Sequence, residues 1–365
     1  MAAVSDDLHA LTLPTPPDGF SLRRAAWDDL FTVAGLYATC SIARVGAVTT
    51  RPADLRVRWL ELGGPDDVLL VEHPDASPSL VAALEFQVDV DPWTDELDLH
   101  VEGRVHPDWE GHGLATYLLD HAEQRARHEA WVAGRETAVL RTTVLDGDRR
   151  ASSFFTSRGF VPVRYLLELR LDLHAAPPAP NWPDGVTVRT FEPGRDEPAL
   201  WAAHLDAFAD NPEFLPLELD EWVEAHLRDP GFDPALVLLA EAAPGVGVGD
   251  DDPLDQPTLV GFAWCRAGAE GAAEEGWIRD LAVVPAWQGR GIGMALLRAA
   301  FAAFRVRGLT GVRLEVDDIT LDGAVALYRR AGMRIARRTD VLEQLLVANA
   351  PVDDPEPPAP LPPAA

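Results

Sequence analysis

The chain has 365 residues, enough for two ordinary domains, and 47% hydrophobic with 25% charged residues is typical of a globular protein. Its formal net charge of −28, from 31 basic and 59 acidic residues, makes nucleic acid an unfavourable partner. Every basic residue is an arginine, which excludes a P-loop lysine and a Schiff-base lysine.

Residues 1–17 lack the basic start and the long apolar core of a signal peptide, and we expect this segment to be flexible. No run approaches ~18 uninterrupted apolar residues. We therefore expect a cytoplasmic protein without a membrane partner. The two cysteines, Cys40 and Cys265, are far apart and outside any CxxC pair, so we expect them to be buried and reduced and we expect no thiolate metal site.

The two halves of the chain repeat each other. "DGFSLRR" from Asp18 matches "DGVTVRT" from Asp184, and "VHPDWEGHGLATYLL" from Val105 matches "VVPAWQGRGIGMALL" from Val283. Landmarks in the same order indicate a duplicated domain. The proline-rich stretch between the copies is a linker, and the acidic proline-rich end is a disordered tail. The predicted bounds are 18–173 for the N-terminal domain, 174–184 for the linker, 185–347 for the C-terminal domain and 348–365 for the tail.

The second copy shows a clear succession of elements. Alternating and 3.6-residue apolar periods, separated by glycine and proline, predict the order βααβββαβαβ, which is a mixed α/β layer fold. The expected elements are a strand at 185–191, helices at 197–208 and 217–227, strands at 235–241, 258–266 and 277–284, a helix at 293–308, a strand at 312–318, a helix at 322–332 and a strand pair within 333–346.

Three glycines, Gly289, Gly291 and Gly293, lie where the strand at 277–284 gives way to a helix. The first N–H groups of a helix lack partners inside the helix, and glycine lets an anion approach them, so this pattern is typical of a phosphate site. The sequence contains no GxxxxGK[ST] motif, and QGRGIG does not open a βαβ unit as a dinucleotide-binding fingerprint does. A tight turn without a ligand is the simpler alternative.

The pattern V-x-P-x-x-Q-x-x-G-x-G from Val283 to Gly293 resembles the acetyl-CoA motif of the GNAT N-acetyltransferase superfamily. The segment from Leu314 to Met333, LEVDDITLDGAVALYRRAGM, is similar to the second motif of that family. The duplication resembles in particular the mycothiol-synthase-like tandem acetyltransferases. The resemblance covers both halves and implies two tandem GNAT-fold domains that use acetyl-CoA as co-substrate and no metal.

The resemblance also implies a set of binding residues. Backbone N–H groups from Gln288 to Met294 would hold the pyrophosphate, and the strand from Leu281 to Val283 would pair with the pantetheine arm. Thr320 stands where relatives often carry Asn, so one of the two amide contacts is lost there. The expected cofactor-binding residues are Leu281, Ala282, Val283, Gln288, Gly289, Arg290, Gly291, Ile292, Gly293, Met294 and Thr320.

Two catalytic groups follow from the resemblance. Tyr328 would protonate the departing thiolate, since a phenol is matched to a thiol leaving group, and the N–H of Val283 would stabilise the oxyanion. A core aromatic is the alternative role for Tyr328. The general base is not identified. Many relatives carry Glu at the position of Trp277, and the remaining nearby carboxylates on the strands are Asp280, Glu315 and Asp317.

The first copy departs from the motif. Glu110 occupies the Gln288 position, and Phe155 occupies the Tyr328 position. We interpret this half as a non-catalytic copy, although Gly111 and Gly113 could still admit a phosphate. Its histidines show no metal-ligand pattern, and we expect surface positions for His106, His112, His121 and His128.

These observations predict an acetyl-CoA-dependent N-acetyltransferase that acts on the primary amine of a small molecule by direct attack on the thioester. A mycothiol precursor is one candidate acceptor by resemblance. Two alternatives stay open. The chain could be a non-catalytic acyl-CoA sensor, or a transferase that uses a longer acyl donor.

Overall fold

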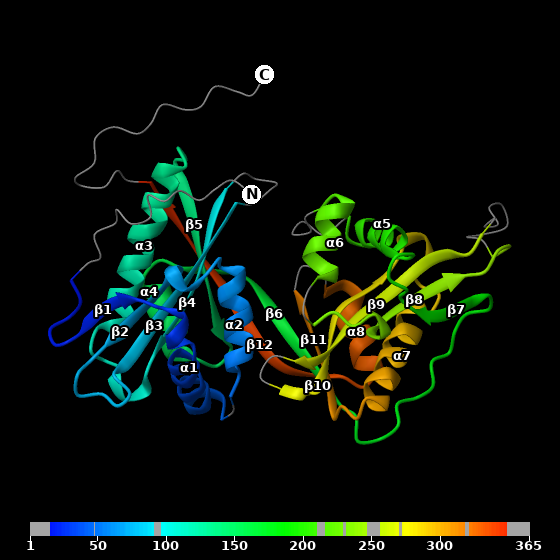
Figure 1. Ribbon diagram of the computed structural model, residues 1–365, viewed down its shortest axis with the longest axis horizontal. Coiled ribbons are helices and arrows are strands. Elements are labelled where there is room, and N and C mark those ends of the chain that lie inside the picture. The colour runs from blue at the N-terminus through cyan, green and yellow to red at the C-terminus, as the bar shows by residue number, and fades with distance from the viewer. Residues whose placement is uncertain are drawn as a thin grey trace. The chain divides into compact units, whose positions relative to one another are not determined.

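The computed structural model describes residues 15–46, 48–90, 96–209, 216–228, 231–246, 256–269, 272–317 and 321–348. The chain divides into two compact units, which we call the N-terminal unit (Met1–Val163 with Thr339–Ala365) and the C-terminal unit (Arg164–Arg338) (Figure 1). No helix within the described ranges is long and apolar enough to cross a membrane. Nearly all of the predicted tail and most of the predicted flexible N-terminus lie outside the described residues.

The N-terminal unit is a mixed sheet with helices on both faces. Its strands follow the order β1-β2-β3-β4-β5-β12, in which only the β4–β5 pair is parallel. Helices α1 and α2 pack on one face and α3 and α4 on the other. The bounds are β1 (Ser21–Arg24), α1 (Leu30–Val45), α2 (Pro52–Glu61), β2 (Val68–Glu72), β3 (Leu80–Val90), β4 (Leu97–Val105), α3 (Leu114–Val132), β5 (Thr137–Leu145), α4 (Arg149–Ser157) and β12 (Arg334–Val347), of which Thr339–Val347 pairs with β5.

The C-terminal unit repeats this arrangement. Its strands follow the order β6-β11-β10-β9-β8-β7, and β10–β11 is the parallel pair. Helices α5 and α6 cover one face, and α7 and α8 cover the other. The bounds are β6 (Val161–Asp172), β7 (Val186–Thr190), α5 (Glu197–Phe208), α6 (Leu219–Leu227), β8 (Val237–Ala242), β9 (Thr258–Ala269), β10 (Ala272–Val283), α7 (Ile292–Val306), β11 (Gly311–Asp317) and α8 (Leu321–Arg330).

The predicted order βααβββαβαβ of the second copy is confirmed, with one difference at its end. The sequence predicts a strand pair within 333–346, whereas β12 is one continuous strand from Arg334 to Val347. The segment contains neither glycine nor proline, so nothing in it supports a tight turn.

The compact units do not coincide with the sequence repeats. Residues 166–172 of β6, which the repeat assigns to the first copy, pair with β11 in the C-terminal unit. Residues 339–347 of β12, which the repeat assigns to the second copy, pair with β5 in the N-terminal unit. Each sheet is therefore completed by the last strand of the other repeat. Residues 174–183, within the predicted linker, form no helix or strand.

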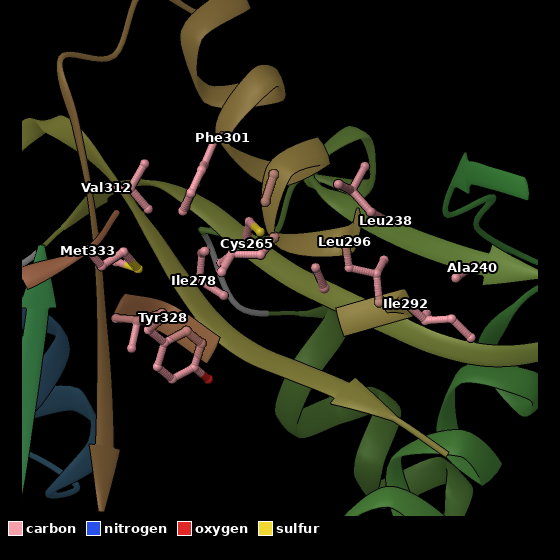
Figure 2. Close-up of a cluster of buried hydrophobic side chains, with 14 of the residues drawn as sticks. Leu238, Ala240, Cys265, Ile278, Ile292, Leu296, Phe301, Val312, Tyr328 and Met333 are labelled. Carbon is pink, nitrogen blue, oxygen red and sulfur yellow. The ribbon is translucent and has the colours of Figure 1, made fainter. Parts of the chain in front are cut away.

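The core of the C-terminal unit lies between its sheet and helices α7 and α8. Leu296, Phe301 and Ile278 are almost completely buried there, together with Cys265. Figure 2 shows these side chains converging from α7 and from the strands, with Tyr328 of α8 at the margin of the same cluster. This packing fixes α7 and α8 against β10, the strand that precedes the glycine loop.

Candidate functional site

The two central strands of the C-terminal unit separate. The parallel ladder between β10 and β11 runs only from Glu275–Gly311 to Trp277–Arg313. Beyond it, β10 stays paired with β9 as far as Val283, and β11 stays paired with β6 as far as Asp317. Within the described residues, the far end of β10 thus has no ladder partner on its β11 side. Such an edge can pair with an extended ligand.

A bulge in β10 adjoins this opening. The register with β9 shifts between Ile278 and Asp280, so one extra residue is placed on β10. Bulges bend a strand and redirect its side chains, and they are common beside active sites. The bend lies where β10 departs from β11.

The backbone of Val283 faces the opening. The N–H of Val284 donates to the carbonyl of Val260 on β9, at 3.0 Å. Because successive N–H groups of a strand point to opposite sides, the N–H of Val283 points away from β9. The side-chain amide of Gln288 donates to the carbonyl of Val283, at 3.1 Å. Gln288 therefore steadies the end of the strand.

The glycine loop connects β10 to α7 and is exposed. Gly291 is the N-cap of α7 with φ of 88°, and Gly289 has φ of 73°, a left-handed conformation that favours glycine. A Cβ added at either position would meet nothing within 4 Å. The first N–H groups of this 15-residue helix have no side-chain cap. This arrangement suits an anion.

The remaining predicted binding residues are placed as follows. Arg290 is exposed, and its guanidinium lies over the ring of Trp287 at 5.0 Å. Gly293 packs close to Leu327, where an added Cβ would lie at 3.4 Å. Ile292 is buried in the core between the sheet and α7, Ala282 is buried on the α5–α6 face, Leu281 and Met294 are half-buried, and Thr320 lies outside the described residues.

Tyr328 on α8 is 9% exposed and packs in the core between the sheet and helices α7 and α8. Its hydroxyl points away from Ile278 and Met333 (Figure 2). Burial, followed by the negative charge of Asp280, raises the pKa of Tyr328 to about 12. The phenol is therefore fully protonated at neutral pH and can act only as a proton donor.

The three candidate carboxylates lie in different surroundings. Asp317 forms an ion pair with Arg164, and Glu315 is exposed. Asp280 is largely buried, and its Oδ2 has no hydrogen-bond partner among the described residues. Burial raises the pKa of Asp280 to about 6, an effect that Arg279 only partly offsets. Trp277, at the position where many relatives carry Glu, lies under the guanidinium of Arg266.

An aromatic wall borders Asp280 on the α5–α6 face, and sequence reasoning missed it. We use this name for His204, Trp222, His226 and Trp264. The ring of His226 stacks on Trp222 with centroids 5.1 Å apart, and Trp222 donates to His204 Nδ1 at 2.8 Å. Burial lowers the pKa of His204 to about 3 and lowers that of His226 as well. The aromatic residues in the sequences of α6 and β9 are the signal that could have indicated this cluster.

The wall is capped by a cation. The guanidinium of Arg279 lies over the Trp264 ring, 5.5 Å from its centroid. Its Nε also lies 3.5 Å from Oδ2 of Asp280. A charged pair and a set of flat rings therefore meet on this side of β10.

The corresponding loop of the N-terminal unit contains its own ion pairs. Glu110 pairs with Arg150 and lies 3.4 Å from Arg44, which also pairs with Asp148. Phe155 packs on Phe160 with ring centroids 5.2 Å apart. A carboxylate and two arginines thus occupy the space beside this glycine loop.

Other expectations for the N-terminal half have mixed outcomes. His106 is half-buried and His112 exposed, but the predicted surface positions of His121 and His128 are wrong, because α3 turns both into the core. Burial lowers the pKa of His121 to about 4. In the part of the chain that the structure describes, no group of His, Cys, Asp and Glu could hold a metal.

Both cysteines are buried, as predicted, and burial raises the pKa of each thiol. A buried thiol with a raised pKa is a poor nucleophile. Neither cysteine is therefore suited to form a covalent intermediate.

Comparisons with known proteins agree with this geometry. The acetyltransferase (GNAT) family model matches residues 46–160 and 209–333. A protein of Thermobispora bispora named mycothiol acetyltransferase is 34% identical over 280 residues, which cover 75% of this chain and 82% of that protein. The crystal structure of a GCN5-related N-acetyltransferase from Sphaerobacter thermophilus aligns with a TM-score of 0.74 and 28% identity, over 92% of this chain and 98% of that one.

A tandem GNAT protein from the clavulanic acid pathway shares the fold, with a TM-score of 0.61 at 16% identity over 91% of this chain and 99% of that one. The family match lies on both repeats and includes the glycine loop, β10 and Tyr328. The chain therefore belongs to the GNAT family of acetyltransferases and carries two copies of its domain.

Proposed function

We propose that the C-terminal unit transfers the acetyl group of acetyl-CoA to the primary amine of a small molecule by direct attack on the thioester. The observation that carries this proposal is the coincidence, in one unit, of three features. These are the open glycine loop before α7, the end of β10 that has no ladder partner on its β11 side within the described residues, and the protonated Tyr328. Each serves a different part of the reaction.

Binding of acetyl-CoA would use the backbone. The N–H groups from Gly289 to Met294 would hold the pyrophosphate, since nothing occupies the Cβ positions of Gly289 and Gly291. The N–H of Gln288, which the motif also predicts as a contact, instead donates to the carbonyl of Pro285 at 3.2 Å. The end of β10, residues 281–283, would pair with the pantetheine arm as an added strand. Arg290 beside the loop adds a positive charge in a chain that is strongly negative overall.

The chemistry would take place at the end of the pantetheine arm. The amine attacks the thioester carbonyl, and the N–H of Val283, which points away from β9, stabilises the oxyanion. The C–S bond then breaks, and Tyr328 protonates the thiolate. No enzyme nucleophile is required, which agrees with the two buried cysteines.

The acceptor would lie beside Arg279, whose guanidinium covers the buried ring of Trp264. The relative from Thermobispora bispora is named mycothiol acetyltransferase, and we propose that the acceptor of this chain is likewise the mycothiol precursor that lacks the acetyl group. Trp222 and Trp264 are themselves buried, so the contact would be made by the partly exposed Arg279, which offers donors for hydroxyl oxygens of the acceptor.

The N-terminal unit would not turn over. The ion pairs of Glu110 with Arg150 and Arg44 lie beside this glycine loop and would compete with a pyrophosphate for the arginines, and Phe155 has no proton to donate. We propose that this unit supports the fold and does not carry out chemistry.

The experiment is a rate measurement with product identification. Purified protein is mixed with acetyl-CoA and the precursor, CoA release is followed, and the product is identified by mass spectrometry. We expect one acetyl group on the precursor amine. Binding of acetyl-CoA without CoA release would favour a sensor, and a faster rate with a longer acyl-CoA would favour another donor.

A further inference from the structure

The duplication places a carboxylate at the same position in both units. Glu102 of β4 and Asp280 of β10 each lie three residues before the valine that ends the strand, Val105 and Val283. The register on the neighbouring strand matches as well, because Glu102 lies opposite Glu85 and Asp280 lies opposite Trp264. The two units can therefore be compared residue by residue at this position.

The carboxylate of the N-terminal unit is neutralised by two arginines. Arg58 Nη1 donates to Glu102 at 2.6 Å, and Arg104 Nη2 donates at 2.5 Å. Burial acts to raise the pKa of Glu102, but Arg104 and Arg58 outweigh it and hold the pKa below its usual value. Two charge-assisted bonds keep this carboxylate ionised and engaged, which makes it unsuited to accept a proton.

The carboxylate of the C-terminal unit lacks this pairing. The counterpart of Arg104 is Ala282, which is buried and apolar, and the residue opposite Asp280 is Trp264. Its nearest cation among the described ion pairs is Arg279, whose Nε lies 3.5 Å from Oδ2, too far for a strong hydrogen bond. A buried carboxylate oxygen without a hydrogen bond is costly, and such groups are common where a proton must be accepted.

The charge of Asp280 acts on Tyr328. The charge of Asp280 is the second cause, after burial, of the raised pKa of Tyr328. In the N-terminal unit the same helix position holds Phe155. The C-terminal unit thus has, together with a phenol, a carboxylate whose Oδ2 accepts no hydrogen bond from the described residues, whereas the N-terminal unit has a doubly hydrogen-bonded carboxylate together with a phenyl ring.

We propose that Asp280 is the general base of the C-terminal unit. This assignment rests on the acetyl transfer proposed above. Asp280 takes one proton from the ammonium of the acceptor, and the freed lone pair of the nitrogen forms the C–N bond.

The protons and electrons balance. The C–S bond breaks with its electron pair on sulfur, and Tyr328 gives that thiolate a proton. The nitrogen loses its second proton, which restores the phenol of Tyr328 through solvent. Asp280 releases its proton to water. Overall one ammonium and one thioester yield one amide, one thiol and one free proton.

The pH profile of the rate must distinguish the titration of Asp280 from that of the other titratable groups around it. Arg279 of β10 carries the permanent charge of an arginine. Burial and the charge of Asp280 both raise the pKa of Cys265 on β9. His204 of α5 titrates well below the relevant range. His226 of α6 is the remaining group that could titrate below neutrality, so it needs its own variant.

The test compares Asp280→Asn and Asp280→Glu with Glu274→Gln, a matched change at an exposed carboxylate on the same strand. Rates are measured from pH 5 to pH 9 with acetyl-CoA and the mycothiol precursor that lacks the acetyl group. We expect kcat of Asp280→Asn to fall by roughly 10²- to 10⁴-fold at pH 7, with loss of the acidic inflection, and Asp280→Glu to recover part of it. Glu274→Gln should behave as the wild type, and His226→Gln should keep the inflection.

Two further readouts separate the outcomes. Calorimetric titration with acetyl-CoA tests the proposed function alone, because wild-type protein that does not bind it overturns that function. The alkaline titration of Tyr328 is measured as the absorbance difference between a protein with Tyr328 and the same protein with Tyr328→Phe. In proteins that carry Asp280→Asn, this titration should lie at lower pH than in proteins that keep Asp280. An Asp280→Asn variant that binds acetyl-CoA, retains near-normal kcat and leaves the Tyr328 titration unmoved overturns the assignment of the base.

Discussion

The stability of the protein should rise, not fall, when the charge of Asp280 is removed at neutral pH. Burial lifts the pKa of this carboxyl from its usual 3.8 to about 6 in the folded chain. The folded state therefore binds the proton more tightly than the unfolded state does. It follows that the contribution of Asp280 to stability is largest below pH ~4 and is lost as pH rises toward and through about 6.

The size of the effect follows from the difference in pKa. A difference of about two corresponds to about 3 kcal/mol, because one pKa unit is about 1.4 kcal/mol. The Asp280 side chain is 19% exposed, so solvent weakens the penalty, and we expect about 1–3 kcal/mol in practice. Asn is nearly isosteric with the protonated acid. Asp280→Asn should thus match the wild type near pH 4 and exceed its stability by that amount at pH 7.5.

The assay is urea unfolding at both pH values, with Glu274→Gln as the control for a change in net charge. Only the difference between variant and wild type is compared, so that titration elsewhere in the chain cancels. A loss of more than about 1 kcal/mol for Asp280→Asn at pH 7.5 would refute the reasoning, because it would mean that the ionised carboxylate makes stabilising contacts.

Three other outcomes are expected. Gly291→Glu should abolish acetyl-CoA binding in a folded protein, measured by calorimetry, whereas Gly113→Glu in the N-terminal unit should leave kcat nearly unchanged; the reverse result would place catalysis in the N-terminal unit. Ending the chain at Arg338 removes the β12 ladder to β5 and the buried side chains Leu342 and Leu346. The N-terminal unit should therefore lose its thermal unfolding transition, and an unchanged transition would contradict the pairing of β12 with β5. Phe155→Tyr should add no activity, and a rate gain that survives Tyr328→Phe would show a second working site.

Much of the fold could be predicted because its signals are local. Apolar periods bounded by glycine and proline indicated the order of strands and helices in the second copy, and the glycines before α7 marked the loop. The partner of the last strand in each repeat could not be predicted in this way. The β5 and β11 strands come from equivalent positions of the two repeats, and the choice between them depends on how the whole chain packs.

The candidate site likewise has one part that the sequence predicts and another that only the fold shows. Backbone features such as the N–H groups after Gly291 follow from the motif, whereas the state of a carboxylate depends on side chains brought from elsewhere. Glu102 and Asp280 look alike in sequence. Only the fold shows that Arg58 donates a hydrogen bond to Glu102, whereas Oδ2 of Asp280 accepts none from the described residues. The burial of His121 escaped notice for a similar reason, because its helix face is set by packing.

The rate of Tyr328→Phe tests the central claim most directly, since this change removes one hydroxyl and keeps the buried ring. With acetyl-CoA and the mycothiol precursor that lacks the acetyl group, we expect kcat to fall by roughly 10²- to 10⁴-fold, while the Kd for acetyl-CoA changes far less. A variant that forms the acetylated product at near wild-type kcat would contradict the account and leave Tyr328 as a core aromatic.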